Sequence, residues 1–235
     1  MPYDLHDNLR SRVRQGLERQ LRRVSCVENL LQLGHRLARA QHVDKLPWLE
    51  PPLRDIYQQL HETGLAQLPL AELGLPLLAT VRAADALVAQ LRERPLPAGE
   101  SCALVPDEAL LSCPEPFLFG LHAPLLDLAE RYLGLPVDYL GVNLKRELAN
   151  GLPVGTRLWH ADPEDERLLK IIVYLSDVDD GSGPFETLDA PSSAQARRAL
   201  RYTWGGHCSA EQVAQVVPPR RWRRCVGPRL TAVFA

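Results

Sequence analysis

Hydrophobic residues in the first half of the chain recur at the spacing of amphipathic helices. Helical periods run through residues 27–38, 53–60 and 77–91, and a shorter helix is expected over residues 124–134. Ahead of them, one aliphatic stripe repeats every fourth residue and consists of Leu5, Leu9, Val13, Leu17 and Leu21. Helices with one apolar side must bury it, so residues 1–130 are expected to be mainly helical and to pack on another layer.

The ends of these helices carry their own signals. Ser25 followed by Glu28 forms the pattern of a capping box, which marks a helix start. Gly64 and Gly134 are placed to end helices, Pro124 to begin one, and Pro95 to close the helix over residues 77–91.

After Gly134 the pattern becomes that of β-strands. Residues 137–148 mix β-branched, aromatic and alternating polar positions, and Asn150 with Gly151 is typical of a tight hairpin turn leading to a strand over residues 156–160. Further strands are predicted at residues 169–175 and 229–234. The acidic segment between them, residues 177–183, is predicted to be a turn rather than a calcium loop, because it lacks a closing glutamate at the right spacing.

Helices followed by antiparallel strands predict an α+β fold. We expect the strands to form a double-stranded β-helix, a barrel of the jelly-roll or cupin kind, with the N-terminal helices packed outside it. The predicted division is a helical region over residues 1–130 and a barrel over residues 131–235, together forming one compact unit.

Composition narrows the class of protein. With 46% hydrophobic and 24% charged residues and a net charge of −2, the chain is typical of a globular protein whose main partner is neither nucleic acid nor a membrane. Its N-terminus lacks the apolar core of a signal peptide, and its five cysteines form no C-x-x-C pair. These features predict a cytoplasmic protein with free thiols. The sequence indicates no oligomeric state.

A possible metal site lies in the H-x-D pair formed by His160 and Asp162. Side chains two residues apart on an extended chain point to the same side, so an imidazole and a carboxylate can meet on one ion. Two histidines and one carboxylate hold iron(II) and leave three positions open. An H-x-D tripeptide is a weak signal alone, and a surface histidine beside a loop aspartate is the competing interpretation. Its place between predicted strands favours a metal site.

The surrounding residues resemble the core of the phytanoyl-CoA dioxygenase-like family of Fe(II)/2-oxoglutarate-dependent oxygenases. The similar stretches are residues 159–165 (W-H-A-D-P-E-D), 170–178 (ending Y-L-S-D-V) and 183–186 (G-P-F-E), and residues 118–145 also resemble what precedes them. The resemblance implies Fe(II), 2-oxoglutarate and dioxygen, with hydroxylation of a small-molecule substrate. It makes His160 and Asp162 iron ligands, and the carboxylate at Asp162 favours hydroxylation over halogenation.

The same family has two further residues without a match in this sequence. A second iron-binding histidine follows, within a few residues, a strand resembling residues 227–234, and an arginine that binds 2-oxoglutarate lies beyond it. Since the sequence ends at Ala235, we expect a barrel that is incomplete at its C-terminus and weak binding of iron(II) and 2-oxoglutarate by these 235 residues.

Other residues of the chain could complete the site. His207 follows Asp162 and is a candidate third metal ligand, the alternative being an exposed loop histidine. Lys145 and Lys170 could bind a carboxylate of 2-oxoglutarate, and Tyr174 could line the cofactor pocket. Strand lysines that face solvent and an aromatic residue of the core are the competing interpretations.

Three functions follow from these alternatives. The first is a small-molecule hydroxylase. The second is a catalytically dead, truncated barrel, either a pseudoenzyme or a binding module, and the third is a cupin that binds a metal with two ligands. An open reading frame past codon 235 that encodes a histidine and then an arginine would favour the enzyme.

Overall fold

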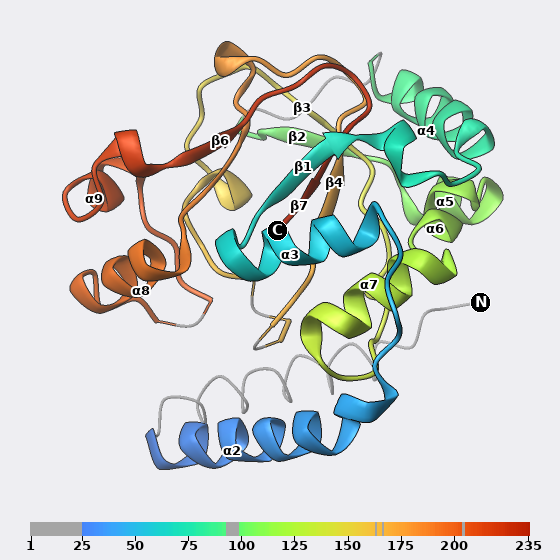
Figure 1. Cartoon of the computed structure of the whole chain (residues 1–235). Helices are drawn as coiled ribbons and strands as arrows, with labels where there is room; N and C mark the ends of the chain where they lie inside the picture. Colours follow the sequence, from blue (N-terminus) through green and yellow to red (C-terminus); the bar gives the residue numbers. More distant parts are fainter. Residues whose placement is uncertain (1–24, 93–98, 163, 166, 204) are drawn as a thin grey trace, which may run out of the picture. The chain divides into compact units, whose positions relative to one another are not determined.

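The computed structural model describes residues 25–92, 99–162, 164–165, 167–203 and 205–235 (Figure 1). Contacts within the chain divide it into two units, residues 1–46 and residues 47–235. In the first unit, α2 (Ser25–His42) is followed by the 3-10 helix η1 (Val43–Lys45). The helix predicted over residues 27–38 is confirmed by α2. The apolar stripe over residues 5–21 lies outside the described residues. The division at residue 130 stays a prediction.

The second unit alternates short helices and short strands. In chain order they are α3 (Leu53–Thr63), β1 (Ala66–Pro69), η2 (Leu70–Leu73), α4 (Leu78–Leu91), β2 (Cys102–Leu104), α5 (Asp107–Ser112), α6 (Glu115–Phe119), α7 (Ala123–Leu133), β3 (Lys145–Glu147), η3 (Gly155–Arg157), β4 (Ile171–Val173), η4 (Asp180–Ser182), β5 (Phe185–Thr187), α8 (Ala190–Ala199), α9 (Ala210–Ala214), η5 (Pro219–Arg221), β6 (Arg223–Cys225) and β7 (Thr231–Phe234).

The predicted helix ends at Gly64 and Gly134 and the predicted helix start at Pro124 are confirmed. Gly64 ends α3 and Gly134 ends α7, each with a positive φ, 74° and 76°. Glycine adopts this left-handed conformation without the steric cost that a Cβ brings. Pro124 lies in the first turn of α7, where its missing N–H costs no helical hydrogen bond. The predicted stop at Pro95 lies outside the described residues.

The strands form small antiparallel sheets. β7 is the central strand of a three-stranded sheet, pairing Phe234 with Ala66 of β1 on one side and with Ile171 of β4 on the other. β2 pairs with β3, and β5 pairs with β6. The described part of the chain is thus a mixed α and β fold whose strands form no closed barrel. No helix in that part is long and apolar enough to span a bilayer.

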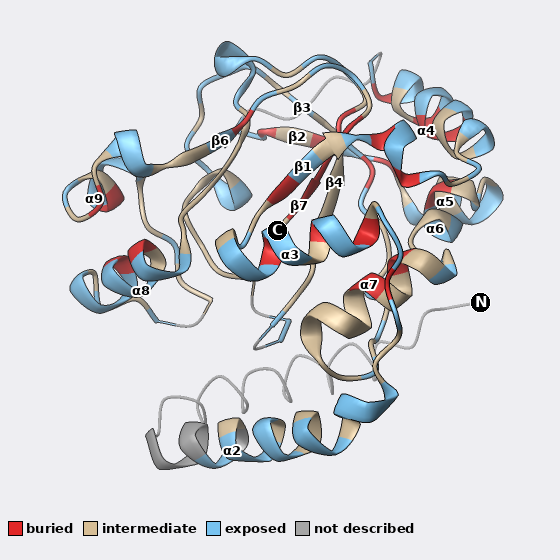
Figure 2. Ribbon diagram, viewed as in Figure 1, coloured by how far each residue is buried: buried red, intermediate tan, exposed pale blue. Residues whose placement is uncertain are grey.

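Two helices cover the three-stranded sheet and bury its central strand. Ile56 of α3 and Leu128 of α7 pack in one cluster with Phe234 of β7, and these three side chains are almost fully buried (Figure 2). Burying a side chain of this size stabilises the fold by about 1.5–3 kcal/mol. Within residues 47–235, α3 and α7 therefore place their apolar stripes against the sheet.

The predicted hairpin differs from the structure in its pairing. Gly151 has the positive φ, 66°, that the predicted turn needs. The segment after it is not a strand, because residues Gly155–Arg157 form a 3-10 helix, and β3 pairs with β2 instead. The guanidinium of Arg157 donates hydrogen bonds to Ser101 O (2.7 Å) and Glu147 Oε2 (3.2 Å). The Arg157 side chain, rather than backbone strand pairing, thus connects this segment to the β2–β3 pair.

Candidate metal centre

His160 and Asp162 follow Trp159, which one antiparallel bridge to Cys208 holds in place. The N–H of Trp159 donates to Cys208 O (2.9 Å), and the N–H of Cys208 donates to Trp159 O (2.8 Å). The chain leaves η3 at Leu158 in an extended conformation, with ψ 151°. The two side chains of the H-x-D pair therefore leave the backbone on the same side.

The polar atoms of the pair face each other. His160 Nε2 lies 3.4 Å from Asp162 Oδ1, and the two side chains are 20% and 28% exposed, so that solvent ions can reach them. His160 Nδ1 lies 2.7 Å from Leu158 O. A carbonyl oxygen only accepts, so Nδ1 is the donor, and in the neutral imidazole Nε2 carries the lone pair. A lone pair facing a carboxylate is favourable only when a proton or a cation lies between them.

His207 lies beside this pair. Its ring centroid is 5.4 Å from that of His160, with the two ring planes inclined by 37°. The bridge between Trp159 and Cys208 explains this proximity, because His160 and His207 are the residues next to the bridged positions. The structure thus places His160 next to each of the other two predicted ligands, Asp162 and His207.

This set of donors fits iron(II) in chemistry, since two imidazoles and one carboxylate are the ligands of the facial triad. The described residues contain no group of three His, Cys, Asp or Glu side chains already arranged to hold a metal ion. Lys170 Nζ lies 2.5 Å from Asp162 Oδ2 and occupies that oxygen. The other oxygen, Oδ1, faces His160 Nε2, so a cation can bind Asp162 there while Lys170 stays at Oδ2. Three-ligand binding requires the imidazoles to turn toward a common point.

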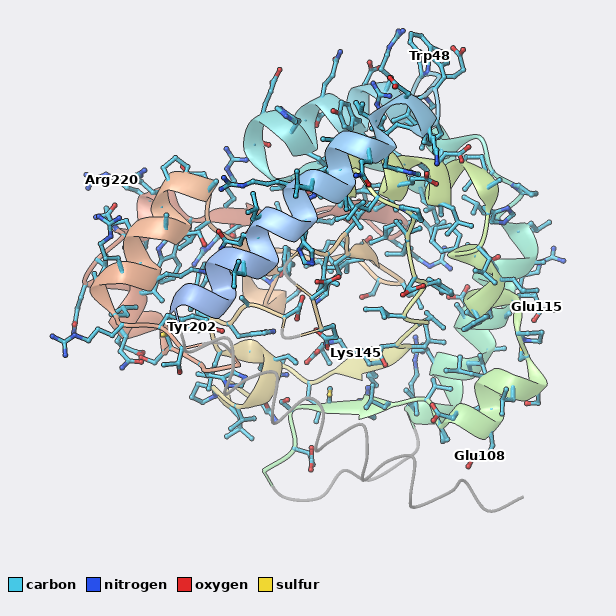
Figure 3. All side chains as sticks on the ribbon, turned by 90° about the horizontal axis from the view of Figure 1, so that it is seen from below. Trp48, Glu108, Glu115, Lys145, Tyr202 and Arg220 are labelled. Carbon is cyan, nitrogen blue, oxygen red and sulfur yellow. The ribbon has the colours of Figure 1, made fainter. Side chains whose placement is uncertain are left out.

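The residues predicted to contact the co-substrate lie in three different settings. Lys170 contacts Asp162 directly, and its side chain is 44% exposed. Lys145, labelled in Figure 3, pairs instead with Glu147 on its own strand at 2.5 Å. Tyr174 is buried, and its hydroxyl donates to Cys225 O at 2.6 Å. Burial raises the pKa of Tyr174, which keeps its hydroxyl protonated as a donor within the core.

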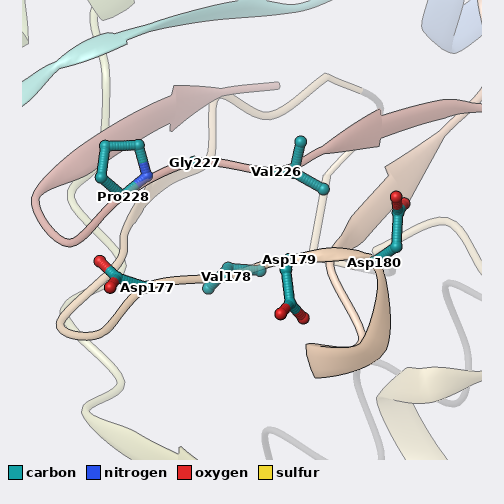
Figure 4. Close-up of a pocket in the computed structure, with 7 residues that line it drawn as sticks. All are labelled: Asp177, Val178, Asp179, Asp180, Val226, Gly227 and Pro228. Atoms are coloured by element: carbon teal, nitrogen blue, oxygen red, sulfur yellow. The ribbon is translucent and has the colours of Figure 1, made fainter.

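A shallow pocket lies between the acidic turn and the segment before β7 (Figure 4). Its lining consists of Asp177, Val178, Asp179, Asp180, Val226, Gly227 and Pro228. The carboxylates already have partners: Asp177 accepts from Arg229 N–H (2.7 Å), Asp179 from the Ser182 hydroxyl (2.6 Å), and Asp180 pairs with Arg224 (3.4 Å). The prediction of a turn here is confirmed by η4, which Asp179 and Ser182 cap reciprocally.

Sequence reasoning missed Tyr202, whose hydroxyl contacts both ligand segments. It accepts a hydrogen bond from Ala161 N–H and donates one to Gly206 O, each at 2.9 Å. A tyrosine shortly before His207 is the one sequence feature that could have suggested it, and that spacing has no general meaning.

Comparisons of the chain with protein-family models, with curated proteins and with solved structures found no match. The family resemblance therefore depends on the motif residues of the sequence alone.

Proposed function

We propose that the chain is an Fe(II)/2-oxoglutarate-dependent dioxygenase that hydroxylates a small organic substrate, with His160, Asp162 and His207 as the iron ligands. The observation that carries the proposal is the position of His160 beside both other residues, with its ring centroid 5.4 Å from that of His207 and its Nε2 3.4 Å from Asp162 Oδ1. The expectation that these 235 residues bind iron(II) weakly stands, because the described residues contain no group of three side chains arranged to hold a metal ion. The proposal includes a double-stranded β-helix, to which the small antiparallel sheets would belong.

When bound, Fe(II) supplies the redox chemistry by which dioxygen, 2-oxoglutarate and a C–H bond become an alcohol, succinate and carbon dioxide. The residues of the chain prepare the site for it. Donation from His160 Nδ1 to Leu158 O leaves Nε2 free to bind a cation. Asp162 supplies the negative charge that compensates a divalent ion.

Lys170 gives the proposed site an order of events. In the metal-free protein its ammonium neutralises Asp162. A divalent cation bound at Asp162 Oδ1 compensates the charge of the carboxylate and repels this ammonium, which can then pair with a carboxylate of 2-oxoglutarate. The metal is therefore expected to bind before the co-substrate.

One observation favours a second candidate function. The Lys170–Asp162 ion pair satisfies the carboxylate without any metal, as a catalytically inactive binding module would need. The two candidates differ in whether the three ligands take up iron(II) and consume 2-oxoglutarate.

The test compares the full chain with His160→Ala, Asp162→Ala and His207→Ala under anaerobic conditions. Titration calorimetry with Fe(II) should give one site per chain in the full chain. Each variant should lose more than the roughly 10- to 100-fold in affinity that is typical of residues behind the ligands. His61→Ala is the control, because His61 lies in the last turn of α3.

Succinate formation then separates the candidates. Iron binding together with succinate formation supports the dioxygenase, and iron binding without succinate formation supports the inactive binding module. A full chain that takes up no iron(II) overturns the proposed site, and unchanged affinity in His207→Ala assigns the third ligand to another residue.

A further inference from the structure

The hydroxyl of Tyr202 lies between the two segments that carry the proposed ligands. It accepts from the N–H of Ala161 at 2.9 Å and donates to the carbonyl of Gly206 at 2.9 Å. A tyrosine hydroxyl has one proton to donate and lone pairs to accept with, so both hydrogen bonds form at once. Ala161 separates His160 from Asp162, and Gly206 precedes His207. Each hydrogen bond therefore ends one residue from a ligand.

The backbone of the loop that carries His207 needs a hydrogen bond of this kind to fix its conformation. Gly205 has a φ of 74°, and the N–H of Gly206 donates to Thr203 O at 2.8 Å in a tight turn. A Cβ at Gly206 would lie 2.9 Å from Thr203 O, so this turn requires glycine there. Two glycines in a row leave the backbone large conformational freedom. The bridge at Cys208 fixes the loop on one side of His207, and the Tyr202 hydroxyl fixes Gly206 on the other.

Tyr202 is itself anchored to α8. Its N–H donates to Arg197 O at 2.9 Å, and the Arg197 guanidinium carbon lies 5.9 Å from the centre of its ring. The residue before it, Arg201, has a φ of 49°. A residue other than glycine rarely adopts this left-handed conformation. The end of α8, beside which Figure 3 labels Tyr202, thus holds the hydroxyl at a defined place.

We infer that Tyr202 is a positioning residue of the metal site, which sets the separation of His207 from the His160–Asp162 pair through its two hydrogen bonds. The inference rests on the proposed function, because it needs His207 to be a ligand. The role belongs to the hydroxyl rather than to the ring, so Tyr202→Phe removes it while keeping the ring and its contact with Arg197.

The test measures Co(II) affinity by calorimetry in a cycle of four proteins: the full chain, Tyr202→Phe, His207→Ala and the double variant. Tyr202→Phe should bind Co(II) about 10- to 100-fold more weakly than the full chain, as is typical when a residue that orients a ligand is lost. In the His207→Ala background the same change should have no effect, because the hydroxyl acts through His207. Tyr139→Phe, the same deletion where the ring packs on Phe117, should leave the affinity unchanged.

A general loss of structure in Tyr202→Phe would lower the Co(II) affinity equally with and without His207. Such an equal loss in both backgrounds, or no loss in either, overturns the inference. If His207→Ala binds no Co(II), the absorption of saturated Tyr202→Phe decides: altered d–d bands support a displaced ligand, and unaltered bands overturn it. If the full chain binds no Co(II), the proposed function itself is overturned. If the full chain binds Co(II) and Tyr202→Phe binds it with the same affinity, only the role of Tyr202 is overturned.

Discussion

At the residue scale, the ion pair between Lys170 and Asp162 brings a positive charge next to the proposed metal site. Both side chains are partly exposed, 44% and 28%, and solvent weakens such pairs to about 0–1 kcal/mol. The competition between ammonium and metal is therefore modest. Without the lysine, a metal at the proposed site would meet no neighbouring ammonium, and a carboxylate of 2-oxoglutarate would lose the cation proposed to bind it.

We predict opposite effects of Lys170→Met on the two ligands. Co(II) affinity should rise by up to about fivefold, the equivalent of about 1 kcal/mol, and 2-oxoglutarate affinity of the metal-loaded protein should fall. Calorimetric titration with each ligand measures both, with Lys45→Met as the control. A fall in Co(II) affinity would instead mean that Lys170 holds Asp162 in its binding orientation.

At the scale of elements, the N-terminus of α8 depends on one carboxylate. Asp189 Oδ1 accepts a hydrogen bond from Ser192 N–H at 2.7 Å and caps the helix. Hydrogen bonds from Ser192, and then the positive charges of Arg221 and Arg223, lower the pKa of Asp189. The cap also begins the helix that ends beside Tyr202.

Asp189→Ala should lower the free energy of unfolding at pH 7 by about 1 kcal/mol, and Asp189→Asn by less, because asparagine also caps helices. A lowered pKa in the folded state means that the charged cap stabilises above the pKa of the unfolded chain. This stability is lost as the pH falls through the folded value. Urea denaturation at pH 7 and pH 3 measures it. Equal acid sensitivity in the full chain and Asp189→Asn would contradict a role for the charge.

At the scale of the whole molecule, one cysteine reports on the integrity of the fold. Cys225 is fully buried in a cluster with Tyr174 and Val233. Burial raises its pKa to about 11, so at neutral pH it is a thiol, which is far less nucleophilic than a thiolate. Cys102 and Cys208 are partly exposed.

In the native protein at pH 8, we therefore expect iodoacetamide to modify Cys208 and Cys102 well before Cys225. Modification of Cys225 should follow the fraction of unfolded chain as urea is added, because that site opens only with the core. Mass spectrometry of peptides after timed labelling measures each rate. Labelling of Cys225 at the rate of Cys208 without urea would show that the β5–β6 region opens by itself.

The sequence by itself determined those features whose cause is local. Gly64 and Gly134 end helices because a glycine tolerates the left-handed conformation at its own position. The β-branched run at residues 169–175 contains β4, and the run at residues 229–234 contains β7. The convergence of His160 and Asp162 is also local, since it follows from a spacing of two in extended backbone.

Only the tertiary structure decided which segments meet. β1 comes from the region predicted to be helical, because a strand of four residues is too short to show a period and is formed by its pairing with β7. β3 pairs with β2, because a strand pairs with the segment that the packing of the core places beside it. The contact of His207 with His160 and the Tyr202 hydroxyl between their segments result from one bridge and from the path of α8. No local pattern encodes such contacts, because they join residues distant in the chain.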